Sequence, residues 1–98
     1  MTKNELIEKI NSMKSAAENM DEPEKTFSLN DIRQLEIEVL GMSVSSIAEK
    51  MQSVSLPNIY EMDIYIKNAN TSTIEHSQRV RYLNSAISLV KEALNIVV

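Results

Sequence analysis

The sequence predicts an all-α fold, a small antiparallel four-helix bundle, and three observations lead to this prediction. Apolar residues recur at helical spacing along four stretches of the chain. The 98 residues include one Gly and two Pro, too few for the frequent turns of a sheet protein. Only 4% of the residues are aromatic, so Leu, Ile, Val, Met and Ala have to build the core. The length is that of a single helical domain over residues 1–98.

The first predicted helix follows an apolar stripe formed by Leu6, Ile10, Met13, Ala17 and Met20. Thr2 is its expected N-cap, with Glu5 as the reciprocal partner in a capping box. The helix is expected to stop near Asp21, because Pro23 follows and the residue before a proline is pushed out of helical geometry.

Residues 21–28 are predicted to form a loop that leads into the second helix. Ser28 is the expected N-cap of that helix, with Asp31 three residues later. Phe27, the only Phe, is expected to pack on Ile32 as a hydrophobic staple rather than to contact a partner.

The second helix is predicted to run from about Leu29 to Ser53, and its apolar face shifts along the way. One stripe is Ile32, Leu35, Val39 and Met42, and another, rotated by roughly a third of a turn, is Ile37, Leu40, Val44, Ile47, Met51 and Val54. Two explanations fit this shift. One long helix is buried on two sides, or the chain breaks near Gly41 and restarts with Ser46 and Glu49 as a capping box. We expect one long helix with a bend at Gly41 or a close backbone approach there, and a fifth helix if the chain breaks.

The third helix is predicted from about Pro57 to Asn68 or Asn70, with the proline in its first turn. Its core stripe is Ile59, Met62, Ile66 and Ala69. Residues 58–68 also alternate between apolar and polar side chains, as a half-buried strand does. The chain offers no second alternating stretch to pair with such a strand, so we expect a helix.

The last helix carries the clearest apolar stripe, formed by His76, Val80, Leu83, Ile87, Val90, Leu94 and Val97. Ser72 and Glu75 are its expected capping box. Ala86 and Ala93 flank the stripe and allow a neighbouring helix to approach closely. Such heptad spacing is typical of a coiled coil and of a bundle helix, and in so short a chain we expect the bundle.

The residue types argue against catalysis and against metal or cofactor binding. With no Cys and one Gly, the chain has neither a thiolate nor a glycine-rich phosphate loop. His76, the only His, is expected to be a partly buried or solvated helix residue. Glu36 and Glu38 point about 200° apart on a helix, and the same spacing separates Glu61 from Asp63, so neither pair forms a carboxylate dyad. We therefore expect no enzyme activity, no cofactor, no metal and no small-molecule substrate.

Charge and hydropathy predict the cellular setting. The net charge of −4 and the lack of a basic patch argue against nucleic-acid binding. The chain shows no apolar signal region, no lipidation motif and no stretch that approaches a membrane span. We expect a cytoplasmic protein without membrane association.

The third predicted helix has more apolar surface than one core stripe uses. Tyr60 and Ile64 form a second row beside that stripe, and Tyr65 is expected roughly opposite part of it. Either the bundle itself covers these side chains or another molecule does. We expect a protein–protein interaction module that binds a partner protein or itself, as a homodimer, with these three residues as anchors.

A second hypothesis concerns the acidic residues, which lean toward the first half of the chain. Glu18 to Glu38 contains seven carboxylates, including Glu36 and Glu38 as candidate interface residues. The size and helical pattern are similar to those of small bacterial and phage accessory proteins, including immunity proteins and secretion chaperones. That similarity is one of architecture alone, from which function does not follow. The acidic segment is the basis of the second hypothesis, an inhibitor, immunity protein or antitoxin that uses it against a basic target, and a secretion-type chaperone is a further alternative.

Overall fold

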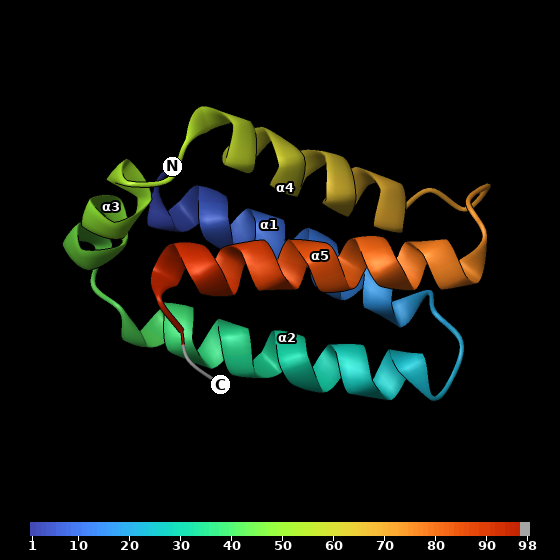
Figure 1. The fold of residues 1–98 in the computed structure, drawn as a ribbon. Helices are drawn as coiled ribbons and strands as arrows, with labels where there is room; N and C mark the ends of the chain where they lie inside the picture. Colours follow the sequence, from blue (N-terminus) through green and yellow to red (C-terminus); the bar gives the residue numbers. More distant parts are fainter. Residues whose placement is uncertain (97–98) are drawn as a thin grey trace.

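The computed structural model describes residues 1–96, and within them it contains five α-helices and no strand (Figure 1). The helices are α1 (Lys3–Glu18), α2 (Glu24–Gly41), α3 (Val44–Gln52), α4 (Leu56–Ala69) and α5 (His76–Leu94). In Figure 1, α1 and α5 lie between α4 and α2, and the short α3 lies at one end of the bundle. Helices α1 and α4 run in one direction, and α2 and α5 in the other. The prediction of a small all-α bundle is confirmed, with the fifth helix present.

The chain breaks after Gly41, so the expectation of one long helix from Leu29 to Ser53 is wrong. Met42 has the extended backbone angles φ −90° and ψ 143°. The hydroxyl of Ser43 then accepts a hydrogen bond from the backbone N–H of Ser46 at 3.1 Å. Ser43 is therefore the N-cap of α3, not Ser46, and this capping bond stabilises the break.

Gly41 is not a point of close backbone approach. No atom from elsewhere in the fold lies within 4 Å of the position that a Cβ would occupy, and its φ is not positive. The end of α2 is held instead by Lys3, whose ammonium donates to the carbonyl of Met42 at 2.7 Å. A cation at a helix C-terminus satisfies unpaired carbonyls and opposes the negative end of the helix dipole.

Helix α2 begins at Glu24, inside the segment predicted to be a loop. Ser28 is buried within the helix and is not its N-cap, and Phe27 is 66% exposed, so it forms no staple. The Glu22 carboxylate takes the capping role by accepting from the backbone N–H and the hydroxyl of Thr26, each at 2.8 Å. An acid four residues ahead of its donor lies outside the usual capping pattern, which explains why the sequence pattern pointed elsewhere.

The carboxyl of Glu22 gives the fold a predicted dependence on pH. Hydrogen bonds from the hydroxyl and then the amide of Thr26 hold the pKa of Glu22 below its ordinary range, and the charge of Lys25 contributes less. Because this pKa is lower in the folded than in the unfolded chain, the carboxylate stabilises the fold above the unfolded pKa. That stabilisation is lost as pH falls through the folded pKa.

We expect Glu22→Gln to melt below the parent at neutral pH, and we expect the two melting temperatures to converge in acid. Thermal melts of both proteins from neutral pH to about pH 3 measure this difference. A gap that stays constant across the pH range would contradict the role of the ionised carboxylate.

The remaining helix starts follow the predictions in part. Thr2 accepts from the backbone N–H of Glu5 at 3.2 Å, as expected for the first helix. Ser55 accepts from the N–H of Asn58 at 3.3 Å, which places the start of α4 one residue before the predicted Pro57. The box predicted for the last helix is not formed, because α5 begins at His76 with Glu75 as an N-cap that makes no side-chain bond. The preceding residues form a turn instead, closed by a backbone bond from Ile74 to Thr71.

Apolar side chains from all five helices form the core of the described residues. Along α5, the predicted stripe is buried from Leu83 to Leu94, whereas Val97 lies outside the described residues. The second stripe predicted for residues 37–54 divides at the break. Ile47 and Met51 are buried, but the part that precedes them is exposed: Ile37, Leu40 and Val44. The change of chain direction after Gly41 is the reason, because the stripe no longer follows one helix face.

Candidate functional site

The outer side of α4 carries three exposed apolar side chains in one line. Leu56, Tyr60 and Ile64 are exposed at 80%, 68% and 41%, and we call them the α4 row. Their spacing of four residues places them on one side of the helix. Met62 and Ile66, both buried, point into the core from the opposite side. The α4 row is therefore surface that the bundle itself does not cover.

Tyr65 does not lie in this row. It is half-buried and stacks on Tyr82 of α5, with ring centroids 6.1 Å apart and an angle of 29° between the ring planes. A residue three positions after Met62 is only about 60° away from it around the helix, so Tyr65 borders the core stripe instead of opposing it. The structure thus places Tyr65 in the seam between α4 and α5, apart from Tyr60 and Ile64.

The two candidate acids lie on α2, on the other side of the molecule from α4 (Figure 1). Glu36 is half-buried and its carboxylate is 3.4 Å from the ammonium of Lys14 on α1. Glu38 is exposed and borders a hollow that is also lined by Lys91 and Ile96 near the end of α5. The structure therefore brings neither acid to the α4 row, and it does not bring the two acids together.

The acidic residues of this segment lie at the end of α1, in the connection to α2 and along α2. Three of those on α2 follow one another at a spacing of seven residues and so share one side of that helix. Glu22 is engaged by Thr26 and Glu36 by Lys14, so part of the charge is already used within the fold.

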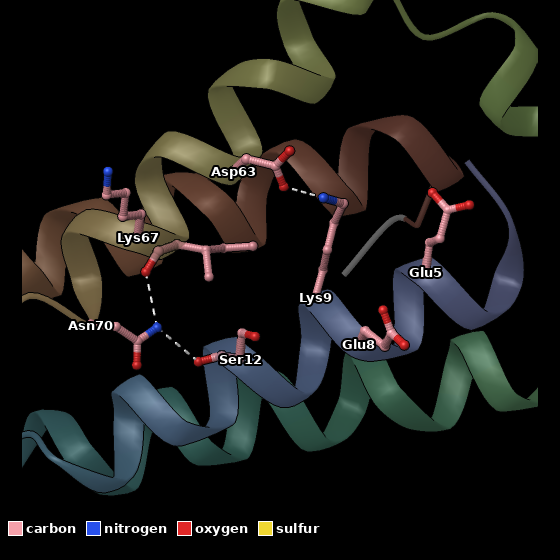
Figure 2. A pocket seen from close by; sticks show the side chains of 8 residues that line it. Glu5, Glu8, Lys9, Ser12, Asp63, Lys67 and Asn70 are labelled. Atoms are coloured by element: carbon pink, nitrogen blue, oxygen red, sulfur yellow. Dashed lines mark hydrogen bonds and ion pairs between the residues drawn. The ribbon is translucent and has the colours of Figure 1, made fainter.

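A polar groove of about 490 Å³ runs between α1 and α4 (Figure 2). Two contacts cross it: an ion pair from Lys9 to Asp63, and a hydrogen bond at 3.1 Å from the side-chain amide of Asn70 to the carbonyl of Ser12. Ile66 contributes to its lining. The groove therefore lies beside the second half of α4, and polar contacts span it at two points.

Charged side chains of both signs lie in the groove between α1 and α4 and near the α4 row. Glu5 and Glu8 line the groove on α1, and Glu61 follows Tyr60 on α4 (Figure 2 labels the first two). Lys67 lies about one helical turn beyond Ile64. Two ion pairs occur within residues 1–96, Lys9–Asp63 and Lys14–Glu36. Neither of them involves Glu5, Glu8, Glu61 or Lys67. Glu5, Glu8 and Lys67 line the same groove, whose residues on α4 all lie in the second half of that helix.

A second set of exposed apolar side chains lies around the break between α2 and α3. Ile37 and Leu40 of α2 and Val44, the first residue of α3, are exposed at 69%, 58% and 66%, and we call them the α2 surface. Ile7 of α1 borders it in a small hollow on one side. These residues were expected inside one long helix, so their exposure was not predicted. The shift of the stripe near Gly41, together with Ser43 as a residue that can cap a new helix, was the signal that could have revealed it.

His76 has a structural contact. Its Nε2 accepts a hydrogen bond from the backbone N–H of Asp21 at 3.0 Å, which ties the α1–α2 connection to the first residue of α5. Within the described residues, no group of three or more His, Asp or Glu side chains is arranged to hold a metal ion. The histidine thus stabilises the meeting of two chain segments.

Comparison of the chain with protein-family models, with curated proteins and with solved structures finds no match. Among the helices of residues 1–96, none combines the length and the apolar character needed to cross a membrane. The function has to be inferred from the surface of the chain itself.

Proposed function

We propose that this chain is a non-enzymatic protein-interaction module that binds a partner protein through the α4 row. The observation that supports the proposal is the line of Leu56, Tyr60 and Ile64 on the side of α4 turned away from the core. Single exposed apolar residues are ordinary on protein surfaces. A contiguous line of them on one helix face is a feature of surfaces that contact other proteins.

The chemistry of the α4 row suits a contact that forms without loss of solubility. Burial of apolar surface contributes roughly 25 cal/mol per Å² removed from water, so covering Leu56 and Ile64 favours association. Tyr60 between them offers a large ring and a hydroxyl that keeps a hydrogen bond at the rim. The opposite side of α4 is anchored by fully buried Met62, so the row is presented by an ordered helix. Binding therefore requires little ordering of the chain, which limits its entropic cost.

The test begins with a photo-crosslinking amino acid at position 60 and, in a second protein, at position 27. Phe27 is a fair control because it is exposed to nearly the same extent as Tyr60, 66% against 68%. We expect one partner to crosslink from position 60 but not from position 27 in cells of the natural source.

That partner is then purified and its affinity measured for the parent and two matched double variants. Leu56→Ser/Ile64→Ser removes one Leu and one Ile from the α4 row, and Ile37→Ser/Leu40→Ser removes the same two residue types from the α2 surface. We expect the first to weaken binding at least about tenfold and the second to leave it nearly unchanged. Both should unfold within about 0.5 kcal/mol per substitution of the parent, because the side chains are exposed. Loss of binding only in the α2 variant, or failure of the α4 variant to fold, would contradict the proposal.

A further inference from the structure

We infer that the outer side of α2 pairs with α2 of a second copy of this chain, as two parallel helices held in register by ion pairs between Arg33 of one copy and Glu38 of the other. Helix α2 lies on the other side of the molecule from α4, so this contact does not depend on the proposed function (Figure 1). The spacing of the exposed residues on α2 and the charges beside them carry the inference.

The exposed residues of α2 repeat with the spacing of a coiled coil. The inner side of the helix is buried and packs on α1 and α5. On the outer side, exposed residues follow one another at alternating steps of three and four, and we call them the α2 seam: Phe27, Asn30, Gln34, Ile37 and Gly41. These steps keep all five on one line along the helix, the arrangement through which two helices pack in a coiled coil.

The α2 seam has apolar side chains near both ends and amides between them. Phe27 and Ile37 are exposed at 66% and 69%, so pairing removes large apolar side chains from water. In a parallel pair in register, Asn30 and Gln34 each meet the same residue of the second copy, and an amide can both donate and accept a hydrogen bond. Polar residues in such a seam fix the register and lower the affinity. We therefore expect a weak but specific dimer.

The charges on the two sides of the α2 seam have opposite signs. Glu24, Asp31 and Glu38 follow one another at seven-residue spacing along one side. Arg33 lies on the other side, and neither ion pair within residues 1–96 includes it or these acids. In a parallel coiled coil, a residue on one side of the seam meets the residue five positions later on the facing side of the other helix. Arg33 and Glu38 are five positions apart, and two-fold symmetry forms their ion pair twice.

The surroundings of Glu38 suit an arginine from a second copy. Leu35 and Ile96 line the hollow beside Glu38, and a methylene stem can lie on such apolar surface while its guanidinium reaches the carboxylate. Lys91 lines the same hollow, but Asp31 and Glu38 together keep this side of α2 acidic.

An antiparallel pair of α2 helices would place like charges together. With the two-fold axis across the helices at Gln34, each side of the seam faces the same side of the second copy. Glu38 would then lie near Asp31 of that copy, and Arg33 near its Arg33. Juxtaposed like charges cost free energy, whereas the parallel pair forms two ion pairs. The α2 seam is therefore complementary to itself in one direction, as a contact between two copies requires.

A single introduced cysteine tests which residues meet, because the chain has no Cys of its own. Asn30→Cys brings two thiols together in the parallel pair, whereas in the antiparallel pair position 30 faces position 38. Asn84→Cys, at an exposed Asn on α5, is the matched control. We expect the Asn30→Cys protein to form a disulfide-linked dimer at least about tenfold faster than the control at equal concentration, since a disulfide needs closely placed backbones.

Charge variants test the ion pairs by sedimentation equilibrium of the full chain at low salt. Arg33→Glu and Glu38→Arg each place like charges in both pairs, and each should weaken dimerisation about tenfold. An equimolar mixture of these two variants restores opposite charges at both pairs and should associate about as tightly as the parent. A folding defect in either variant cannot produce this recovery. Added salt should reduce the difference between the parent and the single variants, because exposed charges are screened.

Three results would overturn the inference. The first is a parent chain that sediments as a monomer up to about 1 mM. The second is a dimer that Leu56→Ser/Ile64→Ser dissociates and Ile37→Ser/Leu40→Ser does not, which would mean that the copies meet through the α4 row. The third is equal rates of disulfide formation in the two Cys variants, or a mixture of the charge variants that associates no better than its components.

Discussion

Leu83→Ala is expected to lower the free energy of unfolding by about 2–5 kcal/mol, the largest effect of any substitution considered for this chain. Leu83 is fully buried within α5, at 0% exposure. Helix α5 contacts each of the other four helices, as α1 also does, so both helices lie at the centre of the fold. Removing most of a side chain from it leaves a cavity that these neighbours fill only in part, and the lost contacts add to the lost transfer free energy.

Such a loss is large against the total stability of a small domain, about 5–15 kcal/mol. Urea unfolding followed by circular dichroism measures it directly. Leu56→Ala is the matched control, the same chemical change at a position that is 80% exposed, and it should stay within about 0.5 kcal/mol of the parent. Equal losses in the two variants would show that the α4 row belongs to the core.

Helical periodicity was sufficient to predict most of the core. Leu6, Ile10 and Met13 of α1 and Leu83 to Leu94 of α5 were expected on buried faces and lie there. Their stripes are long, and each residue is a strong helix former or is tolerated in helices, so local preference and tertiary packing agree.

Helix boundaries were predicted less well, and serine is the common cause. Ser28, Ser46 and Ser72 each stand three residues before an acid, the pattern of a capping box. In the structure Ser28 is buried inside α2, Ser46 donates to the Ser43 cap, and Ser72 precedes the start of α5. A serine inside a helix costs little, so packing of the neighbouring apolar residues overrides the capping signal.

The candidate surface was predicted in part. The outward direction of Tyr60 and Ile64 follows from their position relative to Met62 and needs no tertiary information. Leu56 was missed because the helix was started one residue too late, at Pro57. The surroundings of Tyr65 depend on α5, and sequence periodicity within one helix says nothing about which neighbour approaches it.

The two tyrosines of α4 are therefore expected to differ in what their loss changes: Tyr65→Ala lowers stability, whereas Tyr60→Ala weakens binding. Tyr65→Ala removes a half-buried ring and its stacking on Tyr82. We therefore expect the free energy of unfolding to fall by about 2 kcal/mol. Tyr60→Ala, at 68% exposure, should cost less than about 0.5 kcal/mol but should weaken binding of the partner.

A double-mutant cycle between Tyr65 and Tyr82 isolates the ring contact. We expect a coupling free energy of about 0.5–1.5 kcal/mol, measured by urea unfolding of the parent, the two single variants and the double variant. Partner affinity measured for the same four proteins should stay within about threefold of the parent, because neither ring lies in the α4 row. A Tyr65→Ala protein of unchanged stability but weakened binding would instead place this tyrosine at the interface. The docking surface would then extend from the α4 row across to α5.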